Sequence, residues 1–414
     1  MDYKRCENCH STKFSPEVWN LKKLKDLALL ITDRINVKQV SLEDYVSTEN
    51  LLPNKGGKEK AIKIPPYGNV TRFEKGDILL SNIRPYFKKI WLANDNGGCS
   101  NDVLVIRPKD EIDNSYLYYC LQQDVFFDYV TLSSKGTKMP RGDKDAIFNF
   151  EFPIPPLNEQ KAIAKILCDL DSKIELNQKM NKTLEAISQT LFKHWFIDFE
   201  FPNEEGKPYK SSGGEMVDSE LGEIPKGWQV KYFKDIINLT MGVSPKGNSY
   251  NTDGFGVPLL NGAADFSNGM IEPKKFTTNP VKTCKEDDLL FCIRATIGNL
   301  TYSDREYCIG RGVAALSPIN KIFKEYSYFT LEYGLQDLIS KASGSVIRGL
   351  SKTDIFLYKV LVPKDKIMAE FHFLVSSMFS RIRYLKNETR SLSTLKDSLL
   401  PKLMSGKIRV PLEE

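Results

Sequence analysis

The amino-acid sequence predicts an α+β protein in which two tandem, internally repeated globular domains are separated by two long helices that pair as a coiled coil. Three observations support this prediction: the second half of the chain repeats the first, each half ends in a long heptad pattern, and the two heptad patterns superpose without a gap. A duplication of this length is typical of a pair of domains and not of a solenoid built from short repeats.

The repeat consists of short segments that return in the same order about 208 to 210 residues later. The matching pairs are Trp19 with Trp228, Asp77–Arg84 with Asp287–Arg294, Ser134–Thr137 with Ala342–Ser345, and Ile154-Pro155 with Val362-Pro363. This alignment makes Arg84 and Arg294 equivalent residues at the ends of matching strands.

Length and composition agree with two folded domains. The 414 residues leave room for two cores of about 150 residues each, in addition to connecting helices. Charged residues make up 27% of the chain and hydrophobic residues 41%, and the net charge of +5 permits nucleic-acid binding without requiring it. Because the apolar runs are too short to span a membrane and no secretory signal is present, we expect a cytoplasmic protein.

Within each half, short strands precede a helix. Apolar segments bounded by Gly, Asn, Asp or Pro predict strands at 76–83, 90–93 and 103–106, and the spacing of 116–130 predicts a helix that 327–339 repeats. The Gly- and Ser-rich segment 201–220 is either a surface loop or a hinge. The expected boundaries are 1–156 for the first domain, 157–200 for the central helix, 201–365 for the linker with the second domain, and 366–414 for the second helix with the tail.

Two heptad patterns predict the paired helices, since residues at alternating steps of four and three form an apolar seam in each. The first seam contains Ile163, Leu167, Leu170, Ile174, Leu184 and Leu191, and the second contains Phe371, Val375, Met378, Ile382, Leu385, Leu392 and Leu399. Polar residues interrupt the seams at matching positions, Asn181 with Thr389 and Ser188 with Lys396, and such residues can fix the register of a coiled coil. Amphipathic helices packed only on their own domains would not need this periodicity for so long.

The length of the first helix is informative. A helix over 160–196 spans roughly 55 Å, which is about one and a half turns of B-DNA. A spacer of this length would hold two domains over separate half-sites on one duplex.

The Cys6-Glu-Asn-Cys9-His10 segment has the pattern of a c-type haem attachment site. Haem attachment requires export, for which the sequence has no signal, and a zinc site would lack its second pair of Cys or His ligands. We interpret the pattern as a coincidence near a frayed N-terminus.

Four further segments resemble the DNA-specificity (S) subunit of type I restriction–modification systems over nearly the whole chain. They are Phe152–Gln160 at the start of the first long helix, Leu191–Phe199 at its end, Leu221–Trp228 at the start of the second half, and Leu400–Ile408 near the C-terminus. Their combination in this order is specific to the family, whereas no single segment would suffice. The start of the second helix, at 364–368, and the N-terminal tail depart from the pattern of the family.

The resemblance implies that each domain is a target-recognition domain that reads one half of a bipartite DNA sequence. It also implies that the two helices form an antiparallel coiled coil, which sets the gap between the half-sites and docks two modification (methyltransferase) subunits. Restriction subunits, which act as endonuclease and translocase, would complete the complex on double-stranded DNA, without a membrane. S-adenosylmethionine, ATP and Mg are expected on the partner subunits, and no cofactor or metal is expected on this chain.

The residues themselves do not indicate catalysis. An adenine methyltransferase needs Asn or Asp before two prolines and an aromatic residue, but Ile64 precedes the Pro-Pro-Tyr67 segment. The glycines at 136 and 142 have the wrong spacing for a P-loop, and three histidines support neither a catalytic triad nor a metal site. We therefore expect a subunit that is not catalytic by itself, within an adenine methyltransferase and site-specific deoxyribonuclease complex.

The best candidates for DNA contact are two similar loops, loop 1 (residues 133–142) and loop 2 (residues 341–352), which combine small hydroxyls, glycine and cations. Hydroxyls and backbone amides suit phosphate oxygens, and arginine suits guanine edges. The residues concerned are Ser134, Lys135, Thr137, Lys138 and Arg141 in loop 1 and Ser343, Ser345, Arg348 and Lys352 in loop 2, together with Arg84 and Arg294. The alternatives are solvated basic loops and, for the two strand-end arginines, structural salt bridges. The aromatic residues Tyr86, Phe87 and Trp91 are expected in the core and not on a base-stacking surface.

Two other functions are compatible with the sequence: a non-catalytic coiled-coil scaffold with two protein-binding heads, and the recognition subunit of a related restriction enzyme that cuts outside its site. The scaffold predicts neither paired basic loops nor a salt-sensitive affinity for DNA. Neighbouring genes would distinguish the related enzyme from a type I system.

Overall fold

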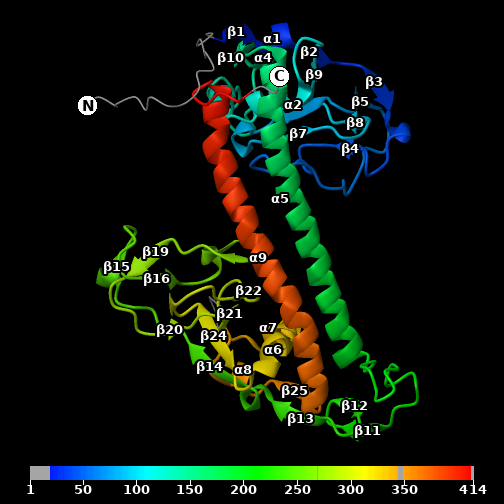
Figure 1. Ribbon diagram of the computed structural model, residues 1–414, viewed down its shortest axis with the longest axis vertical. Coiled ribbons are helices and arrows are strands. Elements are labelled where there is room, and N and C mark those ends of the chain that lie inside the picture. The colour runs from blue at the N-terminus through cyan, green and yellow to red at the C-terminus, as the bar shows by residue number, and fades with distance from the viewer. Residues whose placement is uncertain (1–18, 268, 344–347, 412–414) are drawn as a thin grey trace. The chain divides into compact units, whose positions relative to one another are not determined.

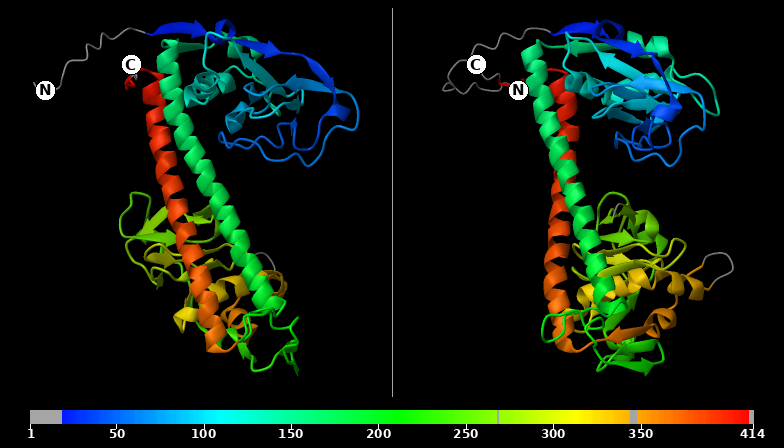
Figure 2. Two further views of the ribbon diagram at one scale, coloured as in Figure 1. Left: turned by 45° about the vertical axis from the view of Figure 1, so that its right-hand side comes forward. Right: turned by 90° about the vertical axis from the view of Figure 1, so that its right-hand side faces the viewer.

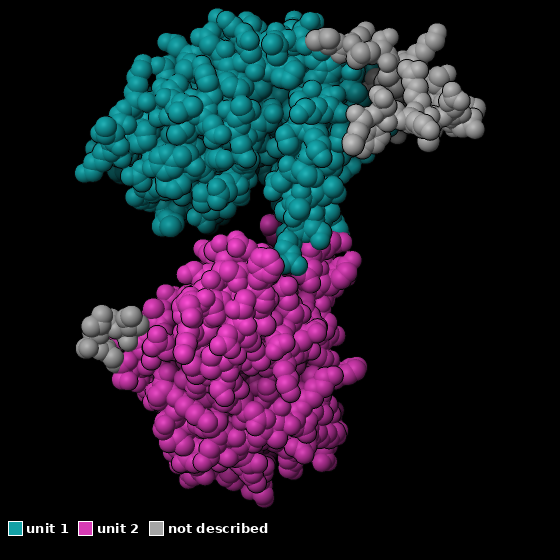
Figure 3. Space-filling view, turned by 90° about the vertical axis from the view of Figure 1, so that its left-hand side faces the viewer, with its two compact units in different colours: residues 1–175, 389–414 teal, residues 176–388 magenta. Residues whose placement is uncertain are grey.

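The computed structural model describes residues 19–411 except 268 and 344–347, and both halves of the chain contain mixed α and β structure (Figure 1). Of these residues, 19–175 and 389–411 form compact unit 1, and those within 176–388 form compact unit 2 (Figure 3). Each unit therefore combines one globular half with parts of both long helices. The Cys6, Cys9 and His10 pattern lies outside the described residues.

The strands of unit 1 are β1 (Asn20–Lys23), β2 (Ala28–Ile31), β3 (Arg34–Asn36), β4 (Tyr45–Val46), β5 (Asn69–Phe73), β6 (Ile78–Ser81), β7 (Ile90–Leu92), β8 (Gly97–Cys99), β9 (Val103–Pro108) and β10 (Glu151–Ile154). One antiparallel sheet has the order β2-β9-β6-β7, a second has the order β3-β5-β8-β4, and β1 pairs with β10. The three strands predicted for this half are confirmed as β6, β7 and β9. All four residues of β6 are buried, which explains its continuous apolar run.

The strands of unit 2 are β11 (Met216–Ser219), β12 (Gly222–Pro225), β13 (Gln229–Tyr232), β14 (Ile237–Met241), β15 (Tyr250–Asn251), β16 (Val257–Leu260), β17 (Phe266–Ser267), β18 (Met270–Ile271), β19 (Lys275–Thr277), β20 (Thr283–Cys284), β21 (Leu289–Cys292), β22 (Leu300–Tyr302), β23 (Tyr307–Ile309), β24 (Val313–Pro318) and β25 (Lys359–Val362). The sheet β14-β24-β21-β22 repeats the order of the first sheet of unit 1, and β13 pairs with β25 as β1 pairs with β10. The second sheet is larger here, with the order β15-β19-β16-β23-β20.

Short helices cover the sheets in both units. They are α1 (Leu24–Leu27), α2 (Asn114–Leu121), α3 (Asp124–Leu132) and α4 (Lys144–Asn149) in unit 1, and α6 (Lys324–Tyr333), α7 (Leu335–Lys341) and α8 (Lys352–Phe356) in unit 2. The prediction of single helices at 116–130 and 327–339 is wrong, because each is broken into two. Gln123 adopts an extended conformation between α2 and α3, and Gly334, where an added Cβ would collide with Tyr358, separates α6 from α7.

The two long helices are α5 (Leu157–Phe192), which continues into a π-helical turn at Lys193–Ile197, and α9 (Asp365–Met404). They run side by side in every view of Figures 1 and 2, and all residues of the two predicted seams are buried or half-buried. Within unit 2, Asn177 donates to Glu388 at 2.7 Å and Ser188 contacts Met378, so the partner number falls as the α5 number rises. The predicted antiparallel coiled coil is thereby confirmed.

The segment that follows α5, residues 201–220, packs within unit 2. The ring of Phe201 is buried and stacks on Trp228 and Tyr209, with centroid distances of 5.1 and 4.6 Å. Part of the segment forms β11, which pairs with β12. Of the two interpretations of residues 201–220, the structure favours an ordered surface loop over a hinge.

Candidate nucleic-acid interface

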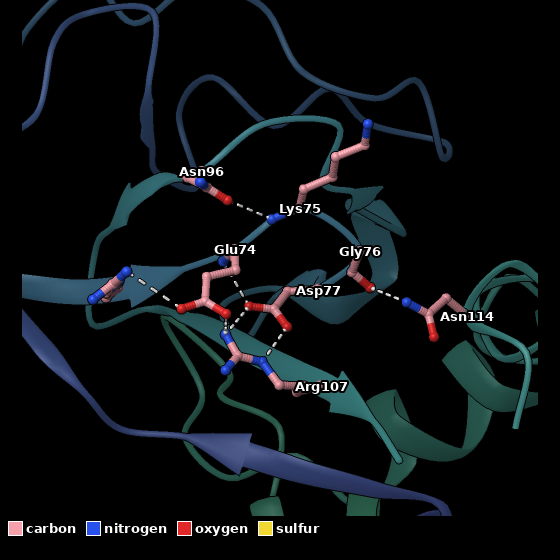
Figure 4. A network of polar contacts seen from close by, with 8 residues as sticks. Glu74, Lys75, Gly76, Asp77, Asn96, Arg107 and Asn114 are labelled. Atoms are coloured by element: carbon pink, nitrogen blue, oxygen red, sulfur yellow. Dashed lines mark hydrogen bonds and ion pairs between the residues drawn. The ribbon is translucent and has the colours of Figure 1, made fainter. Parts of the chain in front are cut away.

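A buried aspartate at the start of the central strand anchors each half. In unit 1, Asp77 is 2% exposed and pairs with Arg107 at 2.7 Å, and the same guanidinium reaches Glu74 at 3.1 Å (Figure 4). In unit 2, Asp288 accepts a hydrogen bond of 2.5 Å from Ser317 on the neighbouring strand. Both carboxylates also accept a backbone N–H from three residues earlier. Since Asp77 directly precedes β6 and Asp288 directly precedes β21, these two residues are equivalent.

This equivalence shifts the sequence alignment of the two halves by one residue, and it overturns the prediction that Arg84 and Arg294 occupy matching positions. The counterpart of Arg84 is Ala295, and both residues have a left-handed backbone with φ of 49° and 59°. The amide of Arg84 donates to the carbonyl of Pro140 at 2.8 Å, as that of Ala295 donates to Arg348 at 3.1 Å. The physical reason is strand pairing, because the buried residues of β6 and β21 set the register.

The two candidate loops share one backbone arrangement. Lys135 and Arg141 exchange two main-chain hydrogen bonds of 2.8 and 2.9 Å, and Ser343 and Gly349 exchange two of 3.2 and 2.9 Å. Each pair closes a short loop between a helix that ends before it and a helix that follows. Arg141 is therefore the counterpart of Gly349, and the loop arginines Arg141 and Arg348 are not equivalent.

Both cations at the base of loop 1 are already paired. Lys135 lies 2.5 Å from Asp143, and Arg141 lies 2.9 Å from Asp102. The hydrogen bond from Lys135 lowers the pKa of the half-buried Asp143 carboxyl, which also caps the N-terminus of α4. Arg141 remains 59% exposed at its side chain, so its guanidinium is accessible although it is oriented by a partner.

The other predicted residues lie in different settings. Thr137 and Lys138 are exposed at the tip of loop 1, whereas the hydroxyl of Ser134 donates to the carbonyl of Thr131 at 2.7 Å. In unit 2, Ser343, Arg348 and Lys352 are exposed, and the ammonium of Lys352 lies 4.7 Å from the ring centroid of Phe356. Ser345 is outside the described residues.

The strand-end arginines are free of the structural salt bridges considered above. Arg84 and Arg294 are both exposed, and neither makes an ion pair within the part of the chain that the structure describes. Two loops closed by the same pair of main-chain hydrogen bonds thus lie at equivalent positions in the two units, and exposed Arg84 and Arg294 lie near them.

A family model described as the type I restriction modification DNA specificity domain matches residues 16–186 and again residues 225–382. The chain belongs to this family. It is 28% identical to the putative type I restriction enzyme MjaX specificity subunit of Methanocaldococcus jannaschii, over 98% of this chain and 97% of that protein. It is 24% identical to the type I restriction enzyme HindI specificity subunit of Haemophilus influenzae, over 94% of this chain and 99% of that protein.

The fold also matches that of a solved family member. The crystal structure of a type I restriction-modification system S subunit from M. genitalium aligns with a TM-score of 0.61 and 19% identity, over 95% of this chain and 98% of that chain. The two matches of the family model follow in tandem, as the internal repeat predicts.

The segment that opens α5 in this specificity-family chain has a structural role that the sequence did not reveal. Glu159 is 3% exposed and forms two hydrogen bonds of 2.6 and 2.9 Å with Arg409, whose guanidinium lies 5.5 Å from the ring of Trp19. Gln160 donates to the carbonyl of Pro155 at 2.9 Å. A buried Glu-Gln pair at the start of an amphipathic helix was the available signal, but the cation lies 250 residues away.

The aromatic residues of unit 1 divide into two groups. Trp91 is buried and contacts Phe73 edge to face at 5.9 Å, which confirms its place in the core. The same prediction is wrong for Tyr86 and Phe87, which are 47% and 40% exposed. At Arg84 the left-handed backbone changes the direction of the chain after the strand and begins a 3-10 turn. This turn places the two rings at the surface.

The described residues give no indication of metal, thiol or membrane chemistry. Among them, no three His, Cys, Asp or Glu side chains are grouped to hold a metal ion, and no helix is long and apolar enough to cross a membrane. Burial raises the pKa of the Cys99 and Cys292 thiols to about 12, so both stay protonated and unreactive near neutral pH.

Proposed function

We propose that this chain is the sequence-specific DNA-recognition subunit of a type I restriction–modification complex, in which each globular half reads one half of a bipartite site. The observation that carries the proposal is the presence of two tandem specificity domains, each with a loop closed by the same pair of main-chain hydrogen bonds at an equivalent position. Exposed hydroxyls, amides and cations on a fixed backbone suit phosphate and base-edge contacts. Arg84, Ser134, Lys135, Thr137, Lys138 and Arg141 serve one half-site, and Arg294, Ser343, Ser345, Arg348 and Lys352 serve the other.

The paired helices α5 and α9 set the gap between the half-sites and dock two modification subunits. The 36 residues of α5 span about 54 Å, which exceeds one turn of B-DNA. Modification and restriction subunits carry S-adenosylmethionine, ATP and Mg, and this chain contributes target selection without a cofactor of its own.

Exchange of one globular half tests the assignment of one domain to one half-site. Residues 20–154, which include both strands of the β1–β10 pair, are replaced by the equivalent segment of a relative with a different target. Mapping of methylated adenines by single-molecule sequencing should then show one new half-site and one unchanged half-site. The matched control exchanges the corresponding segment 229–362 and should alter only the other half-site. A change of both half-sites after a single exchange would overturn the assignment.

Matched deletions test the spacer. Removal of seven residues from the middle of each long helix keeps both seams in phase and shortens the spacer by roughly 10 Å, about three base pairs. The complex should then select a smaller gap between unchanged half-sites. Removal of four residues from each helix, which rotates the seams out of phase, should impair assembly and serves as the control. A variant with the seven-residue deletions that assembles and still requires the original gap would refute the role of the helices as the spacer.

A further inference from the structure

We propose that the Arg84 turn, defined as residues 84–88 of unit 1, is a specificity element that inserts aromatic side chains against the bases of one DNA half-site. The inference rests on the proposed function and deepens it, because it adds to loop 1 a contact of a different chemistry. It also implies that the two half-sites are recognised by different means.

The rings of the Arg84 turn lie together at the surface. Tyr86 and Phe87 are adjacent, both substantially exposed, and their ring centroids lie 4.7 Å apart at an interplanar angle of 53°. Large aromatic groups bury much apolar area when they contact a partner. Two of them held side by side on a 3-10 turn form a compact apolar wedge.

The backbone around the wedge is strained and held in place. Arg84 and Lys88, which flank the rings, have φ of 49° and 51°, and Asn54 and Lys55 in the facing loop have φ of 54° and 62°. The amides of Asn54 and Lys55 donate to the carbonyls of Phe87 and Lys88, each at 2.8 Å. Four of the seven non-glycine residues with positive φ in the described chain therefore meet here. Concentrated backbone strain of this kind is characteristic of ligand-binding sites.

The surroundings of the wedge are cationic. Asp124 is shared by two lysines, Lys55 at 2.9 Å and Lys88 at 2.8 Å. Arg84 and Lys138 make no ion pair with any described residue, and the amide of Arg84 ties the turn to loop 1 through Pro140. An excess of positive charge around exposed aromatic rings favours DNA as the occupant, since phosphates surround the bases on which rings stack.

Unit 2 lacks the wedge. The counterpart of Arg84 is Ala295, and the turn that follows it in unit 2 consists of Thr296-Ile-Gly-Asn299 before β22, so neither ring is repeated. Apolar side chains inserted at a base step unstack it and bend the duplex, and flexible pyrimidine–purine steps deform at the lowest cost. The half-site of unit 1 should therefore contain a distorted step that the half-site of unit 2 does not.

The first test compares Tyr86→Ala, Phe87→Ala and the double variant in the full chain assembled with its modification subunits. Titration with duplexes that carry the mapped site should show binding weakened about tenfold for each ring. Tyr86→Phe, which keeps the ring, should retain near-normal binding. Tyr67→Ala is the matched control, because Tyr67 is an exposed aromatic residue of the same unit outside the turn.

The second test places 2-aminopurine at successive steps of both half-sites. Its fluorescence should rise at one step of the unit 1 half-site only, and the rise should be absent in the double variant. The inference is overturned if the double variant binds the mapped site with normal affinity and normal fluorescence, or loses only subunit assembly. Methylation at the mapped site by the complex with the unaltered chain tests the recognition function separately, so a failure of the wedge and a failure of the proposed function are distinguishable.

Discussion

In unit 1 the ends of the long helices are fastened by charged side chains, whereas the equivalent positions of unit 2 are apolar or aromatic. Glu159 at the start of α5 binds Arg409, which lies over Trp19. The residue equivalent to Arg409 in unit 2 is Phe201, which stacks on Trp228 at 5.1 Å. The corner of each unit, where a segment next to the end of a long helix meets Trp19 or Trp228, is thus held by an ion pair in unit 1 and by stacked rings in unit 2.

A second position shows the same difference. In unit 1 Asp171 accepts hydrogen bonds from Lys396 at 2.7 Å and from the hydroxyl of Tyr119 at 2.8 Å. The residue equivalent to Asp171 in unit 2 is Phe379, whose ring lies 5.2 Å from that of Tyr328. The comparison teaches that the apolar periodicity defines the helix pair, and that a half-buried position beside its seam can hold either an ion pair or an aromatic ring.

The largest expected effect comes from breaking the corner of unit 1. Arg409→Ala should destabilise unit 1 by about 3–5 kcal/mol, because it leaves the buried Glu159 carboxylate without its cation. Phe201→Ala should cost about 3–5 kcal/mol in unit 2 through the cavity it creates. Urea unfolding measures both effects.

A second substitution distinguishes the two corners. Glu159→Leu added to Arg409→Ala should recover most of the loss, because it removes the uncompensated charge. Substitution of Ile367, the residue equivalent to Glu159, should not rescue Phe201→Ala. Equal stability of Arg409→Ala with and without Glu159→Leu would contradict the role assigned to the ion pair.

An intermediate effect is expected at the second position. Asp171→Asn should destabilise unit 1 by about 2 kcal/mol, because Lys396 and Tyr119 lose a charged acceptor. A double-mutant cycle with Lys396→Met isolates the pair, and we expect a coupling energy of about 1 kcal/mol or more. Additive effects of the two substitutions would show that the pair contributes no specific interaction.

The smallest effect concerns acid pH. Hydrogen bonds from Lys88 and Lys55 lower the pKa of Asp124 in unit 1, and burial raises the pKa of Asp287 in unit 2 but is outweighed by Lys324 and Arg383, which lower it. A folded-state pKa below the unfolded value stabilises the protein above the unfolded value, near pH 4, and this contribution is lost as pH falls through the folded pKa.

Variants of the two carboxylates check this sign. Asp124→Asn and Asp287→Asn should each reduce the loss of thermal stability between pH 5 and acid pH, by less than about 1 kcal/mol because both side chains are largely exposed. Melting temperatures across this pH range provide the measurement. A steeper loss in either variant would reverse the assigned direction of the pKa shift.

The periodic features could be predicted from the sequence because they depend on many residues at once. The seams of α5 and α9 and the strands β6, β7 and β9 follow from repeated apolar positions. Sequence similarity at the strand ends aligned Arg84 with Arg294, one residue away from the alignment that the strands require. Only the backbone pairing of the strands determines that register. Likewise, the exposure of Tyr86 depends on the left-handed backbone of Arg84. Arginine rarely adopts this conformation, so the residue type does not predict it.

Contacts between residues far apart in the chain could not be predicted from the sequence for a different reason. The pattern marked Lys396 as a polar residue within a seam, but its partner Asp171 lies beside the other seam and not in it. Glu159 lies in a segment that resembles the family and Arg409 directly follows another, yet neither segment indicates that the two residues pair. Pairing of this kind depends on the direction and register of the helices, which heptads alone leave open.

The buried asparagine in the middle of α5 bears on how the chain folds. Asn177, which follows Ile174 by three residues in the first seam, is fully buried and makes a hydrogen bond to Glu388, where a leucine would provide apolar contacts. The middle of the helix pair should therefore open more readily than its ends, and its amide protons should exchange with solvent sooner. The boundary between the two compact units falls next to this residue in the sequence. Each unit should therefore behave as a separate cooperative folding unit, and the central turns of the helix pair should form last.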